Sequence, residues 1–172
     1  LEKGPMRINL DWLREWIDLR SDANELAERL TTAGLEVEAE LEGAPPFSGV
    51  VIAEIVGTQR PPEADQLKVC EVSDGSTTKS VVCGAPNAEL GVKAAFAPIG
   101  ANLPGGIRID RAQLRVVWSN GMLCSAKELG VGEDGEELVV VCSDIQTGTP
   151  LREYLKLDDV ILDIDLTPNR GD

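Results

Sequence analysis

Apolar side chains recur at steps of three and four positions along residues 8–30, which is the spacing of helices with one buried face. The polar pair Ser21 and Asp22 divides this pattern in two. Either side chain can cap a second helix by accepting free backbone N–H bonds, and Asn9 or Asp11 can do the same for the first. Gly34 suits the left-handed residue that often follows a helix. We therefore predict two short helices before residue 34.

Two later segments alternate apolar and acidic residues with the period of a half-exposed strand, residues 35–41 and 160–166. The Gly-Ala-Pro-Pro run at 43–46 breaks regular structure after the first of them, and residues 151–155 suggest a short helix before the second. The two matching strands can pair with each other. We therefore predict a small discontinuous α/β domain built from residues 6–47 and 151–172, with an inserted unit between its halves.

The intervening residues 48–150 favour short strands separated by Gly-rich and Asn- or Asp-containing turns. The predicted strands are 50–56, 67–72, 79–83, 92–97, 107–109, 114–117 and 138–142. Many short strands in about a hundred residues are typical of a small barrel or sandwich. The chain as a whole is predicted to be α+β, a small α/β domain interrupted by this β unit.

Reactive residues are scarce. The chain has no histidine, and its four cysteines, Cys70, Cys83, Cys124 and Cys142, contain no Cys-x-x-Cys pair. A zinc site needs clustered thiolates or imidazoles, and a Cys or Ser nucleophile usually needs a histidine base. Each cysteine lies beside Val, Leu or Met, which predicts burial as a small apolar side chain. We expect no catalytic site, metal or cofactor in this chain.

The net charge of −14 repels nucleic acid at long range. Residues 48–151 are the least acidic part per residue, with 8 basic and 13 acidic side chains. Any RNA binding therefore requires a local basic patch and should be weak and sensitive to salt. No apolar run is long enough to span a bilayer and no secretion signal is evident, so we expect a cytoplasmic protein. Residues 1–5 are interpreted as a tag remnant before a natural start at Met6.

Residues 119–130 read Ser-Asn-Gly-Met-Leu-Cys-Ser-Ala-Lys-Glu-Leu-Gly. This run resembles the closing segment of the oligonucleotide/oligosaccharide-binding (OB) domain in the β subunit of bacterial phenylalanyl-tRNA synthetase. Further resemblances to that family are found in residues 60–70, in the Cys-Gly-Ala-Pro-Asn turn at 83–87, in the strand 92–101 and at both ends of the chain, 6–17 and 164–172. At the position of Trp118 the family often has an acidic residue, and Pro61 replaces a usual histidine.

The resemblance implies an N-terminal part of the β subunit whose residues 48–150 form an OB-fold tRNA-binding barrel. It implies a parent α2β2 heterotetramer that attaches phenylalanine to its tRNA with ATP and Mg²⁺. The catalytic residues of that family lie in the α subunit. The implied partners are tRNA, the α subunit and the remaining β-subunit domains. No phosphate-binding Gly-Lys-Ser/Thr loop is present here for ATP.

Polar and basic side chains of the predicted barrel, with one methionine, are the candidates for contact with RNA. They are Arg60, Lys68, Lys93, Asn102, Arg115, Ser119, Asn120, Met122, Ser125 and Lys127. Trp118 could stack on an unpaired base if exposed, but the usual burial of tryptophan favours packing in the core or between domains. The 83–87 motif is interpreted as turn geometry, held by Asn87. The second hypothesis is a protein-interaction barrel with little RNA affinity.

Overall fold

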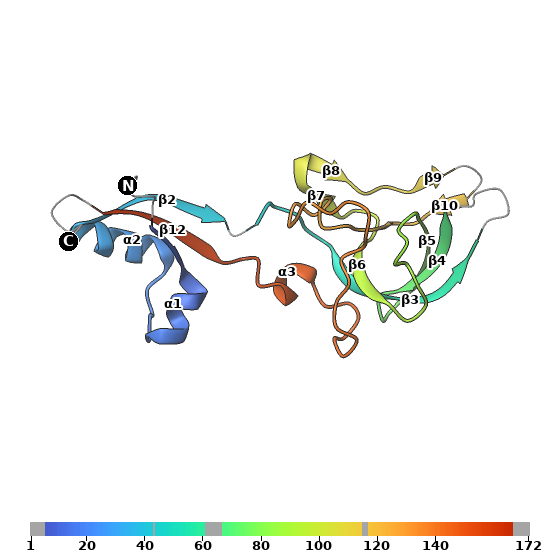
Figure 1. Ribbon diagram of the computed structural model, residues 1–172, viewed down its shortest axis with the longest axis horizontal. Helices are drawn as coiled ribbons and strands as arrows, with labels where there is room; N and C mark the ends of the chain where they lie inside the picture. Colours follow the sequence, from blue (N-terminus) through green and yellow to red (C-terminus); the bar gives the residue numbers. More distant parts are fainter. Residues whose placement is uncertain (1–5, 43, 61–66, 115–116, 167–172) are drawn as a thin grey trace. The chain divides into compact units, whose positions relative to one another are not determined.

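The computed structural model describes residues 6–42, 44–60, 67–114 and 117–166 (Figure 1). The backbone forms two compact units. One consists of residues 1–43 and 156–172, from both ends of the chain, and the other of residues 44–155. No helix among the described residues is long and apolar enough to cross a membrane.

The first unit contains a three-stranded antiparallel sheet in the order β1-β12-β2. Its strands are β1 (Met6–Asn9), β2 (Leu35–Glu42) and β12 (Val160–Leu166). The expected pairing of the two alternating strands is confirmed, with β12 in the middle of the sheet. We did not predict β1, because its four residues are too few for alternation to be recognised. It pairs with β12 from Met6 opposite Ile164 onward.

Two short helices belong to this unit, α1 (Leu10–Trp16) and α2 (Ala23–Thr32). Both caps fall on residues named from the sequence. The Asn9 side chain accepts a 2.7 Å hydrogen bond from the Trp12 N–H, and Asp22 accepts a 2.8 Å bond from the Glu25 N–H. Gly34 has φ 88°, as the predicted helix stop requires.

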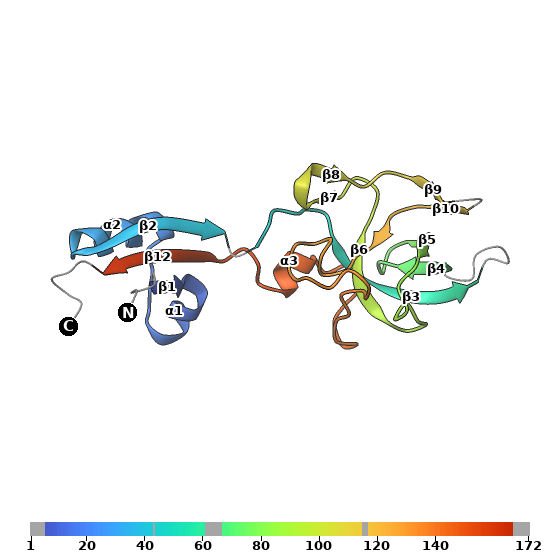
Figure 2. The ribbon, with the colours of Figure 1, turned by 45° about the horizontal axis from the view of Figure 1, so that its top comes forward.

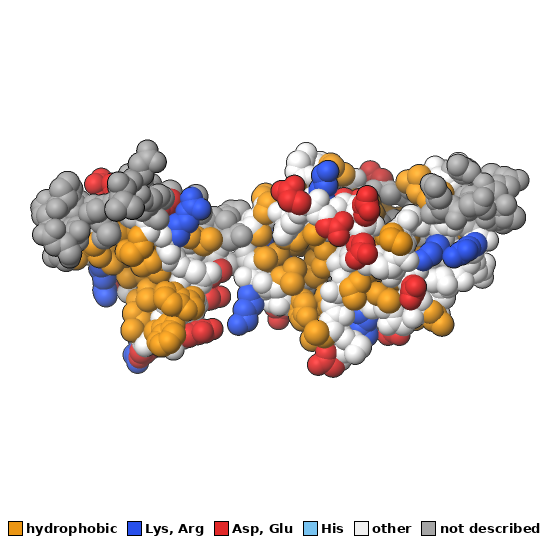
Figure 3. Space-filling model, viewed as in Figure 1, with side chains coloured by type: hydrophobic (Ala, Val, Ile, Leu, Met, Phe, Trp, Pro, Cys, Tyr) orange, Lys and Arg blue, Asp and Glu red, His pale blue; other side chains and the backbone are white. Residues whose placement is uncertain are grey.

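The apolar core of the first unit centres on Leu10, Leu162 and Ile164. The opposite side of α1 leaves Trp12 and Trp16 with 55% and 72% of their surface exposed, and their rings meet edge to face at 6.1 Å. Figure 3 shows hydrophobic side chains gathered over α1. The three- and four-residue spacing thus predicted the helix correctly, whereas it does not account for these exposed tryptophans.

The second unit is built on a five-stranded sheet in the order β11-β6-β3-β4-β5 (Figure 2). These strands are β3 (Val51–Gln59), β4 (Lys68–Ser73), β5 (Thr78–Cys83), β6 (Lys93–Ala97) and β11 (Met122–Leu123). Two small hairpins and two short helical turns complete it: β7 (Asn102–Leu103) with β8 (Ile107–Arg108), β9 (Ala112–Leu114) with β10 (Val117–Ser119), η1 (Pro104–Gly106) and α3 (Leu151–Tyr154).

The sheet is nearly closed into a barrel. β11 pairs with β6 at one edge, and the residues just before β11 reach β5 at the other. The Asn120 N–H donates to the Ser80 carbonyl at 2.9 Å, and the Ser119 hydroxyl accepts from the Val82 N–H at 3.0 Å. A mostly β unit with this barrel-like sheet is consistent with an OB-like fold.

The prediction of a continuous strand over 138–142 is wrong. Leu138 and Val140 form only isolated bridges, to Ser125 and Ala94. The segment is held by separate backbone bonds, in which the Val139 N–H donates to Cys124 and the Val141 N–H donates to Lys93. Its unbroken apolar run resembles that of a buried strand, but its residues do not form a continuous ladder of backbone hydrogen bonds with one neighbouring strand.

The barrel core contains Phe96, Ile55 and Val72, all fully buried, with Cys70 among them. Burial raises the pKa of the Cys70 thiol to about 11 and that of Cys124 to about 12, so both stay protonated at neutral pH. The expectation that every cysteine is buried fails at Cys142, which is exposed. Cys142 belongs to the 138–142 segment, where the predicted strand does not form.

Asp74 organises the turn between β4 and β5. Its carboxylate accepts bonds from the backbone N–H groups of Thr77 (2.7 Å) and Ser76 (2.8 Å), and from both hydroxyls. The backbone bond from Thr77 is the largest cause that holds the Asp74 pKa far below its usual range. A lowered folded-state pKa stabilises the protein above the unfolded value of about 3.9, and this stabilisation is lost as the pH falls.

We therefore expect Asp74→Ala to cost about 1 kcal/mol of unfolding free energy at pH 7, as for the loss of a comparable cap. The difference from the parent chain should shrink as the pH falls from about 4 toward the lowered pKa of folded Asp74, because the unfolded parent binds the proton first and the stabilisation is progressively offset. Urea unfolding of Asp74→Ala and of the parent chain, at pH 7 and at a pH below about 4, measures this difference. An equal difference at the two pH values would contradict the assigned role of the carboxylate.

Candidate functional site

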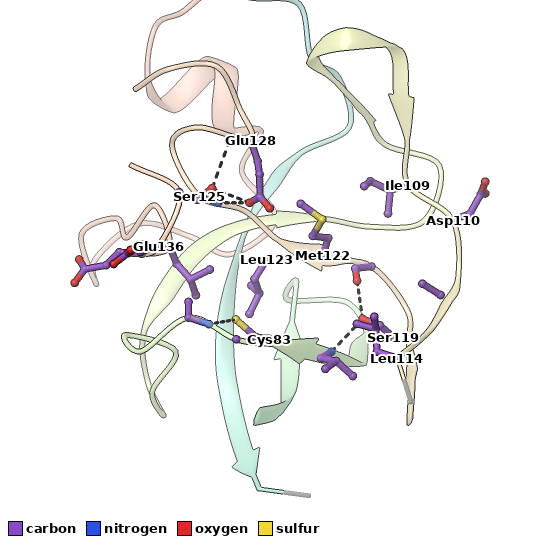
Figure 4. A pocket seen from close by; sticks show the side chains of 18 of the residues that line it. Cys83, Ile109, Asp110, Leu114, Ser119, Met122, Leu123, Ser125, Glu128 and Glu136 are labelled. Carbon is purple, nitrogen blue, oxygen red and sulfur yellow. Dashed lines mark hydrogen bonds between the residues drawn. The ribbon is translucent and has the colours of Figure 1, made fainter. Parts of the chain in front are cut away.

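A groove of about 1070 Å³ opens on one face of the second unit. One wall is formed by the loop 108–112 and the hairpin β9–β10, and the other by residues 125–128 and 135–138. Met122 and Leu123 of β11 lie between the walls (Figure 4). The groove is therefore assembled from segments that the barrel brings together, rather than from one sequence motif.

The two walls carry opposite charge. Arg108 and Arg111 line the first wall, together with Asp110, whereas the second is lined by three acidic side chains, Glu128, Glu136 and Glu137. Segment 107–119 contains three arginines and one aspartate in a chain of net charge −14. A polyanion would be attracted to the arginine wall and repelled by the glutamate wall.

The turn between β10 and β11 is tightly held. The buried Ser119 hydroxyl donates to the Gly121 carbonyl at 2.8 Å while it accepts from Val82. Gly121 has φ 133°, and a Cβ added there would lie 2.6 Å from the Phe96 ring and 2.8 Å from the Ala97 carbonyl oxygen. Only glycine fits this position without displacing the core, so the Ser-Asn-Gly sequence closes the barrel.

A reciprocal cap holds the start of the second wall. The Glu128 carboxylate accepts from the Ser125 N–H at 2.7 Å and from the Ser125 hydroxyl at 2.8 Å, and the Glu128 N–H points back to that hydroxyl at 3.4 Å. This is the arrangement of a capping box, here around a turn rather than a long helix. It fixes the acidic wall and engages the Ser125 side chain (Figure 4).

The family model described as "Putative tRNA binding domain" matches residues 50–150, which include both walls of the groove. The chain belongs to this tRNA-binding domain family. Phenylalanine–tRNA ligase beta subunits from Pseudomonas savastanoi pv. phaseolicola and Hahella chejuensis are 50% and 48% identical to it over 167 residues. These matches cover 97% of this chain and 21% of each relative, so the chain spans about a fifth of their length. A solved structure, the MetRS related protein from Pyrococcus horikoshii, matches with 17% identity over 59% of this chain and 87% of its own, at a TM-score of 0.43.

In this tRNA-binding domain, the structure brings three of the predicted RNA-facing residues to the groove, Ser119, Met122 and Ser125. Met122 is half-buried in its middle. The hydroxyls of Ser119 and Ser125 are buried and bonded within the chain. These two serines stabilise the domain, and we leave them out of the proposed RNA-facing set.

Two predicted lysines also bond within the domain. The Lys68 ammonium donates to the carbonyls of Pro86 and Ala88, both at 2.9 Å. The Lys93 ammonium donates to the carbonyls of Ser143 and Ile145, both at 2.6 Å. Each lysine thereby holds a loop in place. These bonds within the domain account for the position of its side chain without a ligand.

The other candidates are dispersed. Arg60 lies with Lys68 at a separate hollow of about 210 Å³, and exposed Asn102 donates to the Ser48 hydroxyl at 3.2 Å. Asn120 is half-buried, with its side-chain amide 3.4 Å from the Ser80 carbonyl. Exposed Lys127 belongs to the acidic wall segment. Arg115 lies outside the described residues.

Trp118 corrects the sequence interpretation, because 45% of its surface is exposed. Strand alternation explains this. Ser119 points inward and pairs with Ala112, so Trp118 and its partner Gln113 face the opposite side of the hairpin. Arg111 places its guanidinium carbon 4.5 Å above the indole ring. We had not predicted Arg108 or Arg111, although the concentration of arginine in an acidic chain could have indicated them.

Cys83 is the thiol that lines the groove. It is buried, its sulfur accepts from the Ala85 N–H at 3.4 Å, and burial raises its pKa. A protonated thiol is a poor nucleophile. Among the described residues no three carboxylate, thiol or imidazole groups come together as a metal site would require.

Proposed function

We propose that this chain is a tRNA-binding and structural module of the β subunit of a phenylalanine–tRNA ligase, which assists the attachment of phenylalanine to its tRNA. The observation that carries the proposal is the family match over residues 50–150, the part of the chain that forms the grooved barrel. The 50% identity over nearly the whole chain supports the choice of parent enzyme.

We further propose that residues 48–150 are an OB-fold domain inserted into a small α/β domain, residues 6–47 and 151–172. The pairing of β2 with β12 supports this arrangement, because it joins segments from the two sides of the barrel in the sequence. The backbone also separates close to these positions, after residue 43 and before residue 156.

In the whole enzyme, the proposed partners are tRNA, the α subunit of an α2β2 assembly and the other β-subunit domains. The residues of this chain do not fit the ATP and Mg²⁺ that such a ligase uses, since they form neither a phosphate loop nor an acidic metal cluster within the described part. We assign that chemistry to other parts of the enzyme. We propose a cytoplasmic location, which the free buried thiols support.

The charge of the groove indicates which side RNA approaches. The phosphates are attracted to Arg108 and Arg111 on the first wall and are repelled by the glutamates on the second. We therefore place the RNA along the arginine wall and hairpin β9–β10, with Asn120 and Met122 at its edge. The net charge of −14 opposes binding at long range, and the arginine–phosphate contacts release counterions, so affinity should fall with added salt.

Titration of the chain with phenylalanine tRNA tests this proposal. Arg108→Gln should weaken binding and reduce the slope of log affinity against log salt by about one, the change for one lost phosphate contact. Arg20→Gln is the control, because Arg20 is an exposed arginine of the first unit that already pairs with Asp18. Equal effects of the two substitutions would contradict binding along the arginine wall.

A further inference from the structure

Arg111 and Trp118 form a flat, exposed, positively charged surface on the outer face of hairpin β9–β10. The guanidinium carbon lies 4.5 Å above the ring centre, and nearly half of the indole remains open. The ion pairs found among the described residues all involve other arginines. Within the described residues, the Arg111 guanidinium therefore contacts an aromatic ring rather than a carboxylate.

Fold stability does not explain this pair. The inward side of the hairpin already supplies the structural contacts, through Ser119 and its bonds to Val82 and Gly121. Trp118 faces the other way, opposite Gln113. A solvent-exposed cation–π contact contributes only about 0.5–1 kcal/mol. The position instead leaves a large aromatic ring available to a ligand.

We propose that the Arg111–Trp118 pair is a stacking site for an unpaired nucleobase of the bound RNA. An aromatic ring or a guanidinium plane can stack on any base, and a neighbouring cation neutralises the adjoining phosphate. Arg108 and Arg111 supply that local positive charge. Duplex RNA hides its bases within the helix, so the ligand is a single-stranded part of tRNA. This inference rests on the proposed function and extends it to a named pair.

Fluorescence can observe this site alone. The chain has three tryptophans, so Trp12→Phe with Trp16→Phe leaves Trp118 as the sole indole. In that background, phenylalanine tRNA and a single-stranded RNA oligonucleotide should both quench the Trp118 emission, whereas a blunt RNA duplex should not. Quenching by the duplex equal to that by the single strand would contradict base stacking.

Two substitutions separate stacking from charge. Trp118→Ala should weaken tRNA binding about 5- to 150-fold with an unchanged salt slope, the effect of one lost base stack. Arg111→Gln should weaken binding and also lower the salt slope by about one. Trp118→Phe keeps a ring and should retain most of the affinity. Circular dichroism melts of each variant show whether it folds, and the Trp118 quenching experiment still tests the site if Trp118→Ala does not fold.

The outcomes distinguish this inference from the proposed function. If tRNA binds but Trp118 emission and the affinity of Trp118→Ala stay unchanged, the stacking site is refuted and the tRNA-binding function stands. If neither tRNA nor the oligonucleotide binds at low salt, both are refuted. If only the oligonucleotide binds and quenches, stacking is supported and the tRNA function is contradicted.

Discussion

Gly121→Ala is expected to destabilise the second unit by roughly 3 kcal/mol or more, the sum of overpacking and left-handed backbone strain. The new Cβ would lie 2.6 Å from Phe96 and 2.8 Å from the Ala97 carbonyl, at a residue with φ 133°. Both neighbours belong to β6, so relief of the clash would move the strand that pairs with β3 and β11. Urea unfolding gives the change in free energy.

Gly91→Ala is the matched control for this substitution. Gly91 also has positive φ, 82°, but an added Cβ there meets nothing within 4 Å. It should cost only the backbone strain, about 1 kcal/mol. Phe96→Leu should recover part of the loss in Gly121→Ala, because it removes the ring that the methyl group meets. Equal costs at both glycines, with no recovery, would contradict the assigned packing.

Asn87→Ala is the substitution with the second largest expected effect. We expect it to lower the free energy of unfolding by about 2–4 kcal/mol. The Asn87 side chain donates to the Leu138 carbonyl at 3.2 Å and accepts from the Leu138 N–H at 3.0 Å. Removing it leaves both backbone groups of a buried residue unpaired, at about 1–3 kcal/mol each when they stay dry. The glutamate wall should also become mobile, which amide hydrogen exchange at residues 138–141 would detect.

Asn102→Ala is the control for Asn87. Its amide is exposed and donates one 3.2 Å bond to the Ser48 hydroxyl. Water can replace that bond, so its loss should cost less than 1 kcal/mol, near the lower end for a single hydrogen bond. A loss of unfolding free energy for Asn102→Ala as large as that for Asn87→Ala would refute the role given to the half-buried Asn87 amide.

Asn87 also has a hydrogen-bond partner that a local sequence motif could not predict. The Cys-Gly-Ala-Pro-Asn motif predicted a side chain that holds its own turn. The structure instead uses Asn87 to tie the turn to Leu138, 51 positions later. Turn chemistry is local and can be recognised from a few residues. A partner across the barrel depends on strand order, which one sequence does not reveal.

In the candidate site, the burial of Ser119 and the exposure of Trp118 also could not be predicted from the sequence. Polar Ser119 suggested an exposed contact and apolar Trp118 suggested burial, and the structure reverses both. Alternation along β10 requires the two to face opposite sides, but periodicity alone does not say which side is the interior. For each helix cap the sequence offered two residues, and the structure uses one of each pair, Asn9 and Asp22, since a cap depends only on residues about three positions away.

The affinity of the 172-residue chain for phenylalanine tRNA as a function of salt tests the central claim most directly. We predict measurable binding at about 50 mM salt that weakens steeply by about 200 mM, as expected for contacts that release counterions from phosphates. Absence of binding at the lower salt, where attraction to the arginine wall is least screened, would contradict a tRNA-binding function for this chain.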